Sequence, residues 1–454
     1  MAPPAPIFKV QRCEPELITP SKPTPHEFKP LSDIDDQEGL RFHIPVIQIY
    51  RHDPSVEGKD PVQVIRNAIA KALVFYYPFA GRIREGPNRK LIMDCNGEGV
   101  LFIEADANVS LDQSGDALQP PCPFLDELLF DVPGSSRILN CPVILIQVTR
   151  FKCGGFTFAI RLNHTMSDAF GLAQFLSAIA EMARGRQSPS IFPVWERHVL
   201  DARNPPHVTC IHREYDHIEN DQGIPFSLDD IVHRAIFISP SVISTLRSRY
   251  IPPHLPRCTD VEILTACLWK CRTIALQPDA GQEMRLMLIN NARKLNPPLL
   301  PEGYYGNGFI LSTAVATAEE ISKNPIGYGL ELIRKAKMEF DRECIKSVAD
   351  LLVIKGRPHF AVDGTYMVSD VRYAGFKEVD FGWGNAIYGG PAKAIPIYAS
   401  FYVPFERKKG ENGIVIPICL PAQAMERFVK ELKNLLDDNT VIDVNRSSRI
   451  ISAL

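Results

Sequence analysis

The hydrophobic positions of the N-terminal half follow two spacings, one typical of helices and one typical of strands. Residues 60–76 open with Asp60-Pro61 and then repeat apolar residues at intervals of three and four, which predicts an amphipathic helix capped by Asp60. A similar run from Leu172 to Met182, closed by Gly185, predicts a second helix. Short apolar runs bounded by turn residues predict strands at 91–93, 99–104, 142–149 and 156–162.

The C-terminal half repeats this mixture. Thr259 and Glu262 have the spacing of a capping box, and the apolar positions that follow predict a helix. A strand is predicted at 285–290 and a long amphipathic helix at 422–436. Strands and helices therefore interleave on both sides of the chain, which is typical of an α/β protein with mixed sheets.

A segment between the halves lacks either spacing. From 183 to about 215 prolines and charges gather without periodicity, which predicts a crossover linker. A chain of 454 residues is also too long for one hydrophobic core. The expected organisation is an N-terminal domain at 1–185, a linker at 186–215 and a C-terminal domain at 216–454.

The charge and apolar content exclude several classes of partner. A net charge of −3 removes the electrostatic case for nucleic acid. No apolar run approaches the roughly 20 residues that span a bilayer, and the N-terminus lacks the apolar core of a secretory signal. We expect a cytoplasmic monomer that binds small molecules. The final Ser452-Ala453-Leu454 resembles a peroxisomal address without its basic residue, so the peroxisome is the alternative location.

The eleven cysteines show neither C-x-x-C pairs nor histidine partners at metal spacing. Cys267 and Cys271 lie one helical turn apart in an apolar stretch, and we expect buried thiols there rather than a metal site or a disulfide. The sequence predicts a reduced protein without a structural metal.

Four H-x-x-x-D pairs occur in the chain, so the spacing alone carries little information. Two of them, His212 with Asp216 and His217 with Asp221, fall in or beside the polar linker and are interpreted as solvated. A third pair is His359 with Asp363. The fourth lies in LNHTMSDAFG at 162–171, between the strand FTFAIRL and the helix that follows. Such junctions are where α/β proteins expose reactive side chains.

His164 in this junction could act as a general base, because a neutral imidazole accepts a proton near cellular pH. The chain has no G-x-S-x-G elbow and no cysteine beside a histidine in a turn, so the histidine would act directly on a bound substrate. Asp168 could organise the imidazole, cap the helix, or pair with a distant arginine. We favour a structural role for it.

A glycine-rich stretch, EVDFGWGNAIYGGP, lies at 378–391. Its G-x-G does not predict a dinucleotide site, because Ile387 takes the third glycine position and no strand-turn-helix pattern surrounds it. The stretch instead predicts a tight loop whose shape matters, built around Trp383.

LNHTMSDAFG at the end of a strand, followed far downstream by DFGWG, resembles the plant BAHD acyltransferases over essentially the whole chain. The resemblance implies two chloramphenicol-acetyltransferase-like domains with a channel between them, acyl-CoA as co-substrate, and no tightly bound cofactor. Further stretches resemble members that benzoylate benzyl alcohol and members that make fruit esters. These stretches lie at 22–46, 74–91, 296–307 and 368–393.

The resemblance also implies roles for individual residues. His164 matches the general base, and Asp168 matches an aspartate that points away from the channel towards an arginine, here Arg293. Trp383 would donate a hydrogen bond to the oxyanion. The loop that shapes the coenzyme site would contain Asp380, Gly382 and Gly384. The segments lining the coenzyme channel would contain Thr265, Tyr304, Ser312 and Lys393.

The expected activity is therefore transfer of an acyl group from CoA to an alcohol, with benzoyl-CoA and benzyl alcohol as the first pair. The alternative within the class uses acetyl-CoA or another short acyl-CoA with aliphatic alcohols. A non-catalytic binding protein and a hydrolase are alternatives from other classes. After Lys393 the chain runs AIPIYASF, shorter than in relatives, which leaves the acceptor preference open.

Overall fold

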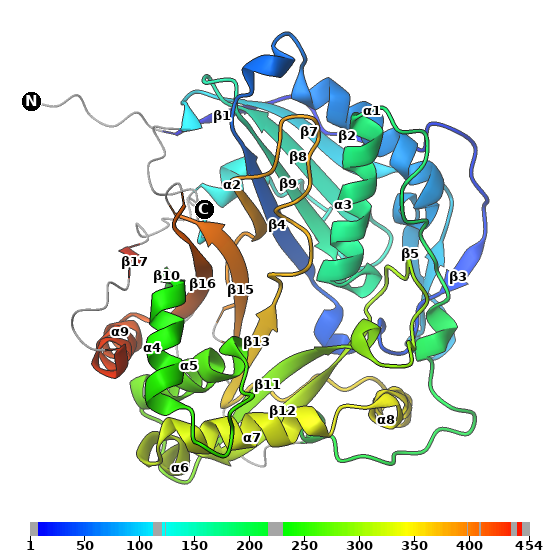
Figure 1. The fold of residues 1–454 in the computed structure, drawn as a ribbon. Coiled ribbons are helices and arrows are strands. Elements are labelled where there is room, and N and C mark those ends of the chain that lie inside the picture. Colours follow the sequence, from blue (N-terminus) through cyan, green and yellow to red (C-terminus); the bar gives the residue numbers. More distant parts are fainter. Residues whose placement is uncertain are drawn as a thin grey trace, which may run out of the picture.

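The computed structural model describes residues 8–111, 120–122, 124–216, 230–396, 398–407, 410–436 and 443–446. Within these ranges the chain forms two mixed sheets of seven strands and one sheet of three, with helices packed on the large sheets (Figure 1). The predicted α/β class with two sheet-rich halves is confirmed. The pair His217 and Asp221 and the C-terminal Ser452-Ala453-Leu454 lie outside the described residues.

The first large sheet is built mainly from the N-terminal half. Its order is β1-β7-β8-β9-β4-β14, and β2 also pairs with β7. β8 and β9 are buried almost throughout, which explains their nearly continuous apolar sequences. The strands are β1 (Val10–Arg12), β2 (Glu16–Ile18), β4 (His43–Tyr50), β7 (Val100–Ala107), β8 (Ile144–Arg150), β9 (Phe156–Asn163) and β14 (Tyr388–Pro391).

Two helices, α1 (Pro61–Phe75) and α3 (Ala169–Ala183), lie side by side on one face of this sheet (Figure 1). Their apolar faces share one core with the sheet, as the predicted helices at 60–76 and 172–182 require. Asp60 caps α1 by accepting the Val62 N–H at 3.1 Å. The smaller elements of this half are β3 (Phe28–Pro30), β5 (Arg82–Glu85), β6 (Leu91–Asp94) and α2 (Leu125–Leu128).

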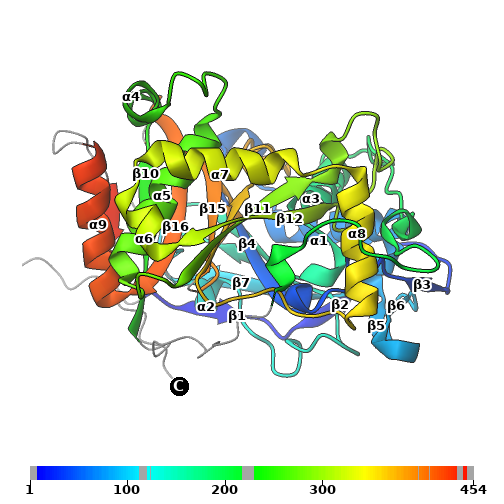
Figure 2. The ribbon, with the colours of Figure 1, turned by 90° about the horizontal axis from the view of Figure 1, so that it is seen from below.

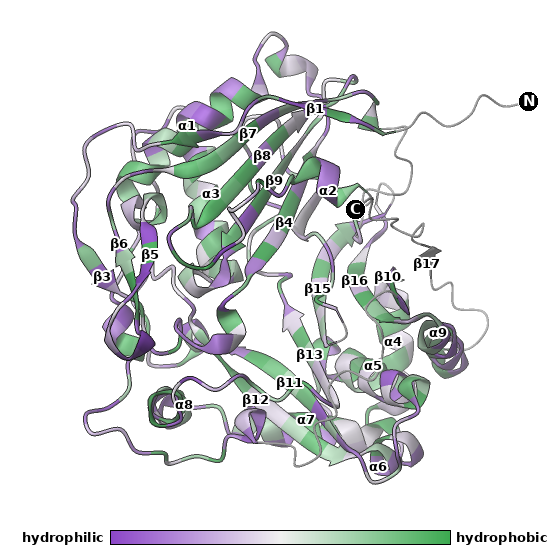
Figure 3. Cartoon of the chain, turned by 180° about the vertical axis from the view of Figure 1, so that it is seen from behind, coloured by the Kyte–Doolittle hydropathy of each residue, from purple (hydrophilic) through white to green (hydrophobic). Residues whose placement is uncertain are grey.

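The second large sheet has the order β12-β11-β13-β15-β16-β10-β17. Hydrophobic residues follow the strands of both large sheets (Figure 3). The strands are β10 (Ile231–Ile238), β11 (Glu283–Asn291), β12 (Phe309–Thr317), β13 (Thr365–Asp370), β15 (Ala399–Glu406), β16 (Asn412–Pro421) and β17 (Asp443–Arg446). The helices are α4 (Pro240–Tyr250), α5 (Asp260–Leu276), α6 (Ala318–Lys323), α7 (Ile326–Met338), α8 (Arg342–Ile354) and α9 (Ala422–Leu436).

Among these helices, α5 begins with the capping box predicted from Thr259 and Glu262. α8 lies apart from the others, on the opposite side of the molecule from α9 (Figures 1 and 2). No helix in the described ranges is long and apolar enough to cross a membrane.

One strand crosses between the two halves. β14 comes from the C-terminal half but pairs antiparallel with β4, with Tyr388 opposite Ile49 and Pro391 opposite Val46. It thereby covers an edge of the first sheet that would otherwise leave backbone groups unpaired. The domain boundaries predicted at 185 and 216 assign β14 to the C-terminal domain, although it pairs with the N-terminal sheet. The sequence of a four-residue strand does not indicate which sheet the strand joins.

The linker is less solvated than its sequence suggests. Residues 184–216 run along the outside of the molecule towards α8 (Figure 1). His212 nevertheless is buried, with its Nε2 2.7 Å from the Ser347 hydroxyl and its Nδ1 3.1 Å from Glu214. The interpretation of His212 as a solvated residue is therefore wrong. Polar composition concealed the burial of His212, because its imidazole finds one polar partner on α8 and one within the linker.

Candidate active site

The junction between β9 and α3 is held in place on both sides of His164. The Asn163 side chain accepts the Thr165 N–H at 3.2 Å. The His164 N–H donates to the Phe42 carbonyl at 2.8 Å. One 3-10 turn, His164–Met166, separates strand from helix. The backbone that carries the imidazole is thus fixed by a strand paired on both edges and by a capped turn.

The hydrogen bonds around His164 determine which ring nitrogen is free. Asn307 uses its Nδ2 to donate to Asp35 at 2.8 Å and to the His164 carbonyl at 2.9 Å. Its Oδ1 therefore faces the His164 Nδ1, 3.2 Å away, and can only accept. The proton of a neutral imidazole then belongs on Nδ1. Nε2 keeps its lone pair, as a general base requires.

Burial lowers the pKa of His164 below its usual range, and Asp168, Asn307 and Asp35 offset only part of that effect. The imidazole is consequently neutral at pH 7 and able to accept a proton. Its side chain is partly exposed and lines a cavity, where a substrate can reach it.

Asp168 is fully occupied by other partners. One carboxylate oxygen accepts the Gly171 N–H at 2.9 Å and so caps α3. The other lies 2.7 Å from a guanidinium nitrogen of Arg293 and 2.9 Å from the Gly308 N–H. Burial raises the pKa of Asp168, but Arg293 and these hydrogen bonds outweigh it and the net pKa is lowered. The carboxylate joins β9–α3 to the segment that follows β11.

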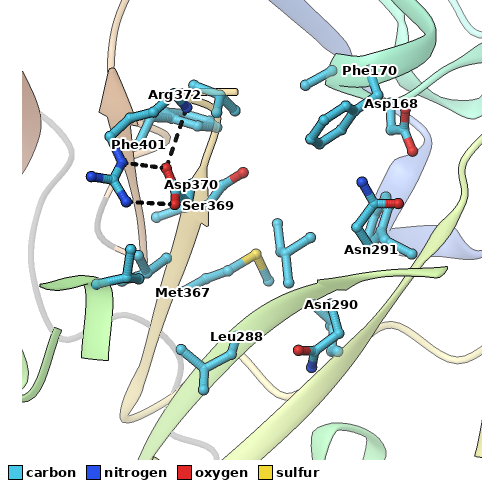
Figure 4. Close-up of a pocket in the computed structure, with 18 of the residues that line it drawn as sticks. Asp168, Phe170, Leu288, Asn290, Asn291, Met367, Ser369, Asp370, Arg372 and Phe401 are labelled. Atoms are coloured by element: carbon cyan, nitrogen blue, oxygen red, sulfur yellow. Dashed lines mark hydrogen bonds and ion pairs between the residues drawn. The ribbon is translucent and has the colours of Figure 1, made fainter. Parts of the chain in front are cut away.

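The cavity beside His164 has a volume of about 840 Å³ and lies between the two large sheets. Its walls include residues of β4, β11 and β13. Figure 4 shows Asp168, Phe170 and Asn291 on one side and Asp370 and Arg372 on the other. This volume suits a small-molecule site between two domains.

Two groups of lining residues differ in character. The charged cluster is defined as Arg247, Asp260, Glu262, Lys337, Asp370 and Arg372. Its members pair with one another, as Arg247 does with Asp260 at 3.0 Å and Lys337 with Glu262 at 2.6 Å. The apolar cluster is defined as Leu40, Phe42, Phe309, Phe360 and Tyr398. Its Phe42 ring lies 5.2 Å from the His164 ring.

The DFGWG loop folds around its aspartate. One Asp380 oxygen accepts the N–H groups of Gly382 at 2.7 Å and Gly384 at 2.8 Å. Both glycines have positive φ, +108° and +79°, which side chains with a Cβ rarely adopt. Arg184 at the end of α3 binds the same aspartate. The loop is thereby anchored immediately before β14.

Trp383 lies far from His164. Its ring packs against Phe156, at the first residue of β9, whereas His164 follows the last. Seven residue steps, roughly 23 Å, separate Phe156 from Asn163, the last residue of β9, and His164 lies one residue further on. The prediction that Trp383 donates to the oxyanion is therefore wrong. The indole is a packing group of the first core.

The sequence matches the Transferase family over residues 8–435. The chain is 61% identical over 452 residues to a benzyl alcohol O-benzoyltransferase of Petunia hybrida, covering 99% of this chain and 98% of the relative. It is 52% identical over 460 residues to alcohol acyl transferase 1 allele GSa of Malus domestica, covering 99% and 100%. This chain belongs to the BAHD transferase family.

Solved structures share the fold of this BAHD transferase. Vinorine synthase matches it with a TM-score of 0.73 at 24% identity, over 94% of this chain and 99% of that one. TRI101 of F. sporotrichioides, complexed with coenzyme A and T-2, matches with a TM-score of 0.69 at 16% identity, over 89% and 97%. The protein is an enzyme of the acyltransferase class, acting on alcohols with acyl-CoA as co-substrate.

The four residues assigned to the coenzyme channel take different positions. Thr265 lines the cavity, and its hydroxyl lies 2.9 Å from that of Tyr402. Ser312 lies behind the lining residue Asn290, whose amide donates to it at 2.7 Å. Tyr304 is buried between Arg197 and Arg293, and Lys393 is exposed near His233. Neither reaches the lining formed by the described residues.

Two residues of the site were missed by sequence reasoning. Asn307 orients His164, and Asp35 in turn orients Asn307, accepting its backbone N–H at 2.9 Å and its amide at 2.8 Å. Asp35 also pairs with the buried Arg197 of the linker at 2.8 Å. Asn307 belongs to a stretch that resembles the family, but no spacing links either residue to His164 in the sequence.

The remaining H-x-x-x-D pair does not assemble a comparable site. His359 uses its Nδ1 on the neighbouring Phe360 carbonyl at 2.8 Å, while its partner Asp363 lies near Gln282. Across the part of the chain that the structure describes, no group of three or more His, Cys, Asp or Glu side chains is arranged to hold a metal ion.

Proposed function

We propose that this chain transfers a benzoyl group from benzoyl-CoA to benzyl alcohol, with His164 as the general base. The observation that supports this most is the His164 Nε2, left free by the Asn307 contact inside a cavity of about 840 Å³. The 61% identity to the Petunia hybrida benzyl alcohol O-benzoyltransferase supports the choice of substrates.

The two clusters divide the cavity between the substrates in this proposal. We place the polar, phosphate-bearing coenzyme at the charged cluster, whose arginine and lysine side chains would exchange their carboxylate partners for its phosphates. The apolar cluster suits an aromatic alcohol, because aromatic side chains pack well on a benzyl ring. The acyl carbon would then lie beside His164, whose ring contacts Phe42 and Phe309 of the apolar cluster.

Transfer would proceed directly between the two bound substrates. The His164 Nε2 removes the hydroxyl proton of the alcohol as its oxygen attacks the thioester carbonyl. Asp35, acting through Asn307, stabilises the imidazolium that results. The tetrahedral intermediate collapses with loss of the CoA thiolate, which takes the proton from the imidazolium. No covalent acyl-enzyme is formed.

The test is a panel of acyl-CoAs and alcohols given to the purified protein, with free thiol and ester measured separately. We expect stoichiometric release of thiol and benzyl benzoate, with the highest kcat/KM for benzoyl-CoA and benzyl alcohol. Thiol without ester would identify a hydrolase instead, and neither product a binding protein.

The same panel decides between the two acyltransferase candidates. The second candidate uses short acyl-CoAs and aliphatic alcohols, and the 52% identity to an alcohol acyl transferase of Malus domestica is compatible with an alcohol acceptor other than benzyl alcohol. A higher kcat/KM for acetyl-CoA with such alcohols would select it. The monomeric state and the cytoplasmic location stay predictions.

Phe360 offers a test of where the alcohol binds. Its ring lies against Gly39 so closely that a Cβ on Gly39 would meet it at 2.5 Å. We expect Phe360→Ala to enlarge the part of the cavity that the apolar cluster lines. The kcat/KM for benzyl alcohol should fall about tenfold, and the kcat/KM for bulkier alcohols should rise. Gly39→Ala should push the ring into the cavity and have the opposite effect on bulky alcohols.

Phe192→Ala is the matched control, because that phenylalanine is exposed on the surface. Its kinetics should equal those of the unmodified enzyme for every alcohol. If Phe360→Ala altered KM for the acyl-CoA while leaving the alcohol preference unchanged, the alcohol would not bind at the apolar cluster.

A further inference from the structure

The linker is attached to α8 by a dense set of polar contacts. Arg203 pairs with Asp350 at 2.6 Å and with Glu343 at 2.8 Å. Lys346 donates to the carbonyls of Val199 and Asp201. The position of the linker on this helix is therefore determined by charge-assisted hydrogen bonds over several turns.

A second group of contacts holds the linker immediately around Cys210. The Ser347 hydroxyl oxygen accepts the N–H groups of Thr209 and Cys210, both at 2.9 Å. The same hydroxyl lies 2.7 Å from the buried His212. Because the backbone of Cys210 is bonded directly to α8, its side chain has little freedom to move away from that helix.

The side chain that Cys210 meets on α8 is another cysteine. The Sγ of Cys344 lies 2.7 Å from the Sγ of Cys210 and donates its hydrogen towards it. This separation is within about 0.7 Å of the S–S bond length of a disulfide. Both cysteines are partly exposed, unlike Cys267 and Cys271, which are buried.

We propose that Cys210 and Cys344 are a redox site, at which a peroxide such as hydrogen peroxide forms a disulfide between the linker and α8. The Cys210 thiol loses its proton and, as the thiolate, attacks a peroxide oxygen. The O–O bond breaks and the leaving hydroxide takes up that proton, so that a sulfenic acid and water result. The Cys344 sulfur then attacks the Cys210 sulfur, the S–O bond breaks and a second water leaves. Two thiols are oxidised as one peroxide is reduced to two waters.

The geometry assigns the order of these steps. Burial and the hydrogen bond to Cys210 raise the pKa of Cys344, so Cys344 keeps its proton while Cys210 receives that hydrogen bond. The sulfur that accepts the bond is the better first nucleophile. Cys344 is then already in contact with the sulfenic acid that it must resolve.

The disulfide would tie two distant parts of the chain, since 134 positions separate its cysteines. Closing so long a loop stabilises the folded state. The opposite face of α8 packs through Ile345, Val348 and Leu352 in one core with Phe309 and Phe360 of the apolar cluster. The linkage would therefore restrain a helix that supports the cavity wall.

The test compares the full-length protein after treatment with hydrogen peroxide and after treatment with dithiothreitol. We expect the oxidised protein to lose two of its eleven thiols and to yield a tryptic cross-link between peptides 204–213 and 343–346. Its Tm should rise by roughly 5 °C, and the reductant should reverse all three changes.

Cys210→Ser and Cys344→Ser, two independent variants, should each abolish the cross-link and the reversible Tm shift. Cys13→Ser, at an exposed cysteine, is the control and should retain both. A different pairing in the cross-link map, conversion of Cys210 to sulfinic acid without a cross-link, or an equal Tm shift in the Cys344→Ser protein would each overturn the proposal.

Discussion

The His164→Ala enzyme is expected to lose about 10²- to 10⁴-fold in kcat for benzoyl transfer, with the fold intact. His164 supplies the lone pair that accepts the proton of the alcohol. Asn307 and Asp35 cannot replace it, because they only orient the imidazole ring. Alanine leaves the backbone contacts of the junction unchanged. Single-turnover rates with saturating substrates measure the loss, and circular dichroism and Tm measure the fold.

The control for this variant is His207→Ala, which removes an exposed histidine of the linker and should leave kcat unchanged. Substantial ester formation by a well-folded His164→Ala enzyme would contradict the general-base mechanism. An equal loss in both variants would point to a general disturbance of the fold.

The pH dependence offers an independent test of the same role. The pKa of His164 is lowered from 6.5, so the neutral base is the main form at pH 7 and persists below pH 6.5. We expect kcat/KM to be flat near neutrality and to fall on the acidic side, with a midpoint below 6.5. The residual activity of His164→Ala should lack this acidic limb. A midpoint above 6.5 would be inconsistent with an imidazole whose pKa is lowered by desolvation.

The second large effect is expected at Asp168. Asp168→Asn should lower the free energy of unfolding by about 3 kcal/mol, because it leaves the Arg293 guanidinium without its carboxylate and weakens the cap of α3. Activity should fall in parallel with the amount of folded protein. Urea unfolding and soluble yield measure the stability, and the pH–rate profile of the folded fraction should keep the shape of the parent.

Asp216→Asn is the matched control, since Asp216 is exposed in another H-x-x-x-D pair. Its stability and kinetics should not change. Arg293→Lys keeps the charge but loses the fork that also binds the carbonyls of Tyr304 and Gly306, so it should be intermediate. A fully stable Asp168→Asn enzyme with an altered pH–rate profile would place Asp168 in the proton path.

The lowered pKa of Asp168 also predicts how stability varies with acid. A carboxyl whose folded pKa lies below its unfolded value of 3.8 stabilises the fold above that value. The contribution is lost as the pH falls through the folded pKa. Parent and Asp168→Asn stabilities should therefore converge at low pH, and persistence of the full difference would contradict the ion pair.

Local patterns were sufficient for most elements of the fold. The helix starts at Asp60 and Thr259 follow from side chains that cap nearby N–H groups, and such contacts depend only on neighbours in the chain. The strand before His164 was equally visible, because β9 is buried on both faces. The place of β14 was not, since its pairing with β4 depends on residues more than 300 positions away.

In the active site too, contacts between neighbours in the chain could be predicted from the sequence, and contacts between distant residues could not. By itself the sequence determined where a base could be exposed, in a turn between a strand and a helix, and its resemblance to the family indicated the Arg293 partner. The tertiary structure determined which nitrogen of His164 is free, through the hydrogen bonds of Asn307 and Asp35. It also showed that Trp383 packs at the end of β9 that lies away from His164. Caps and periodicity act between neighbours, whereas hydrogen bonds and packing between distant segments exist only once the chain is folded.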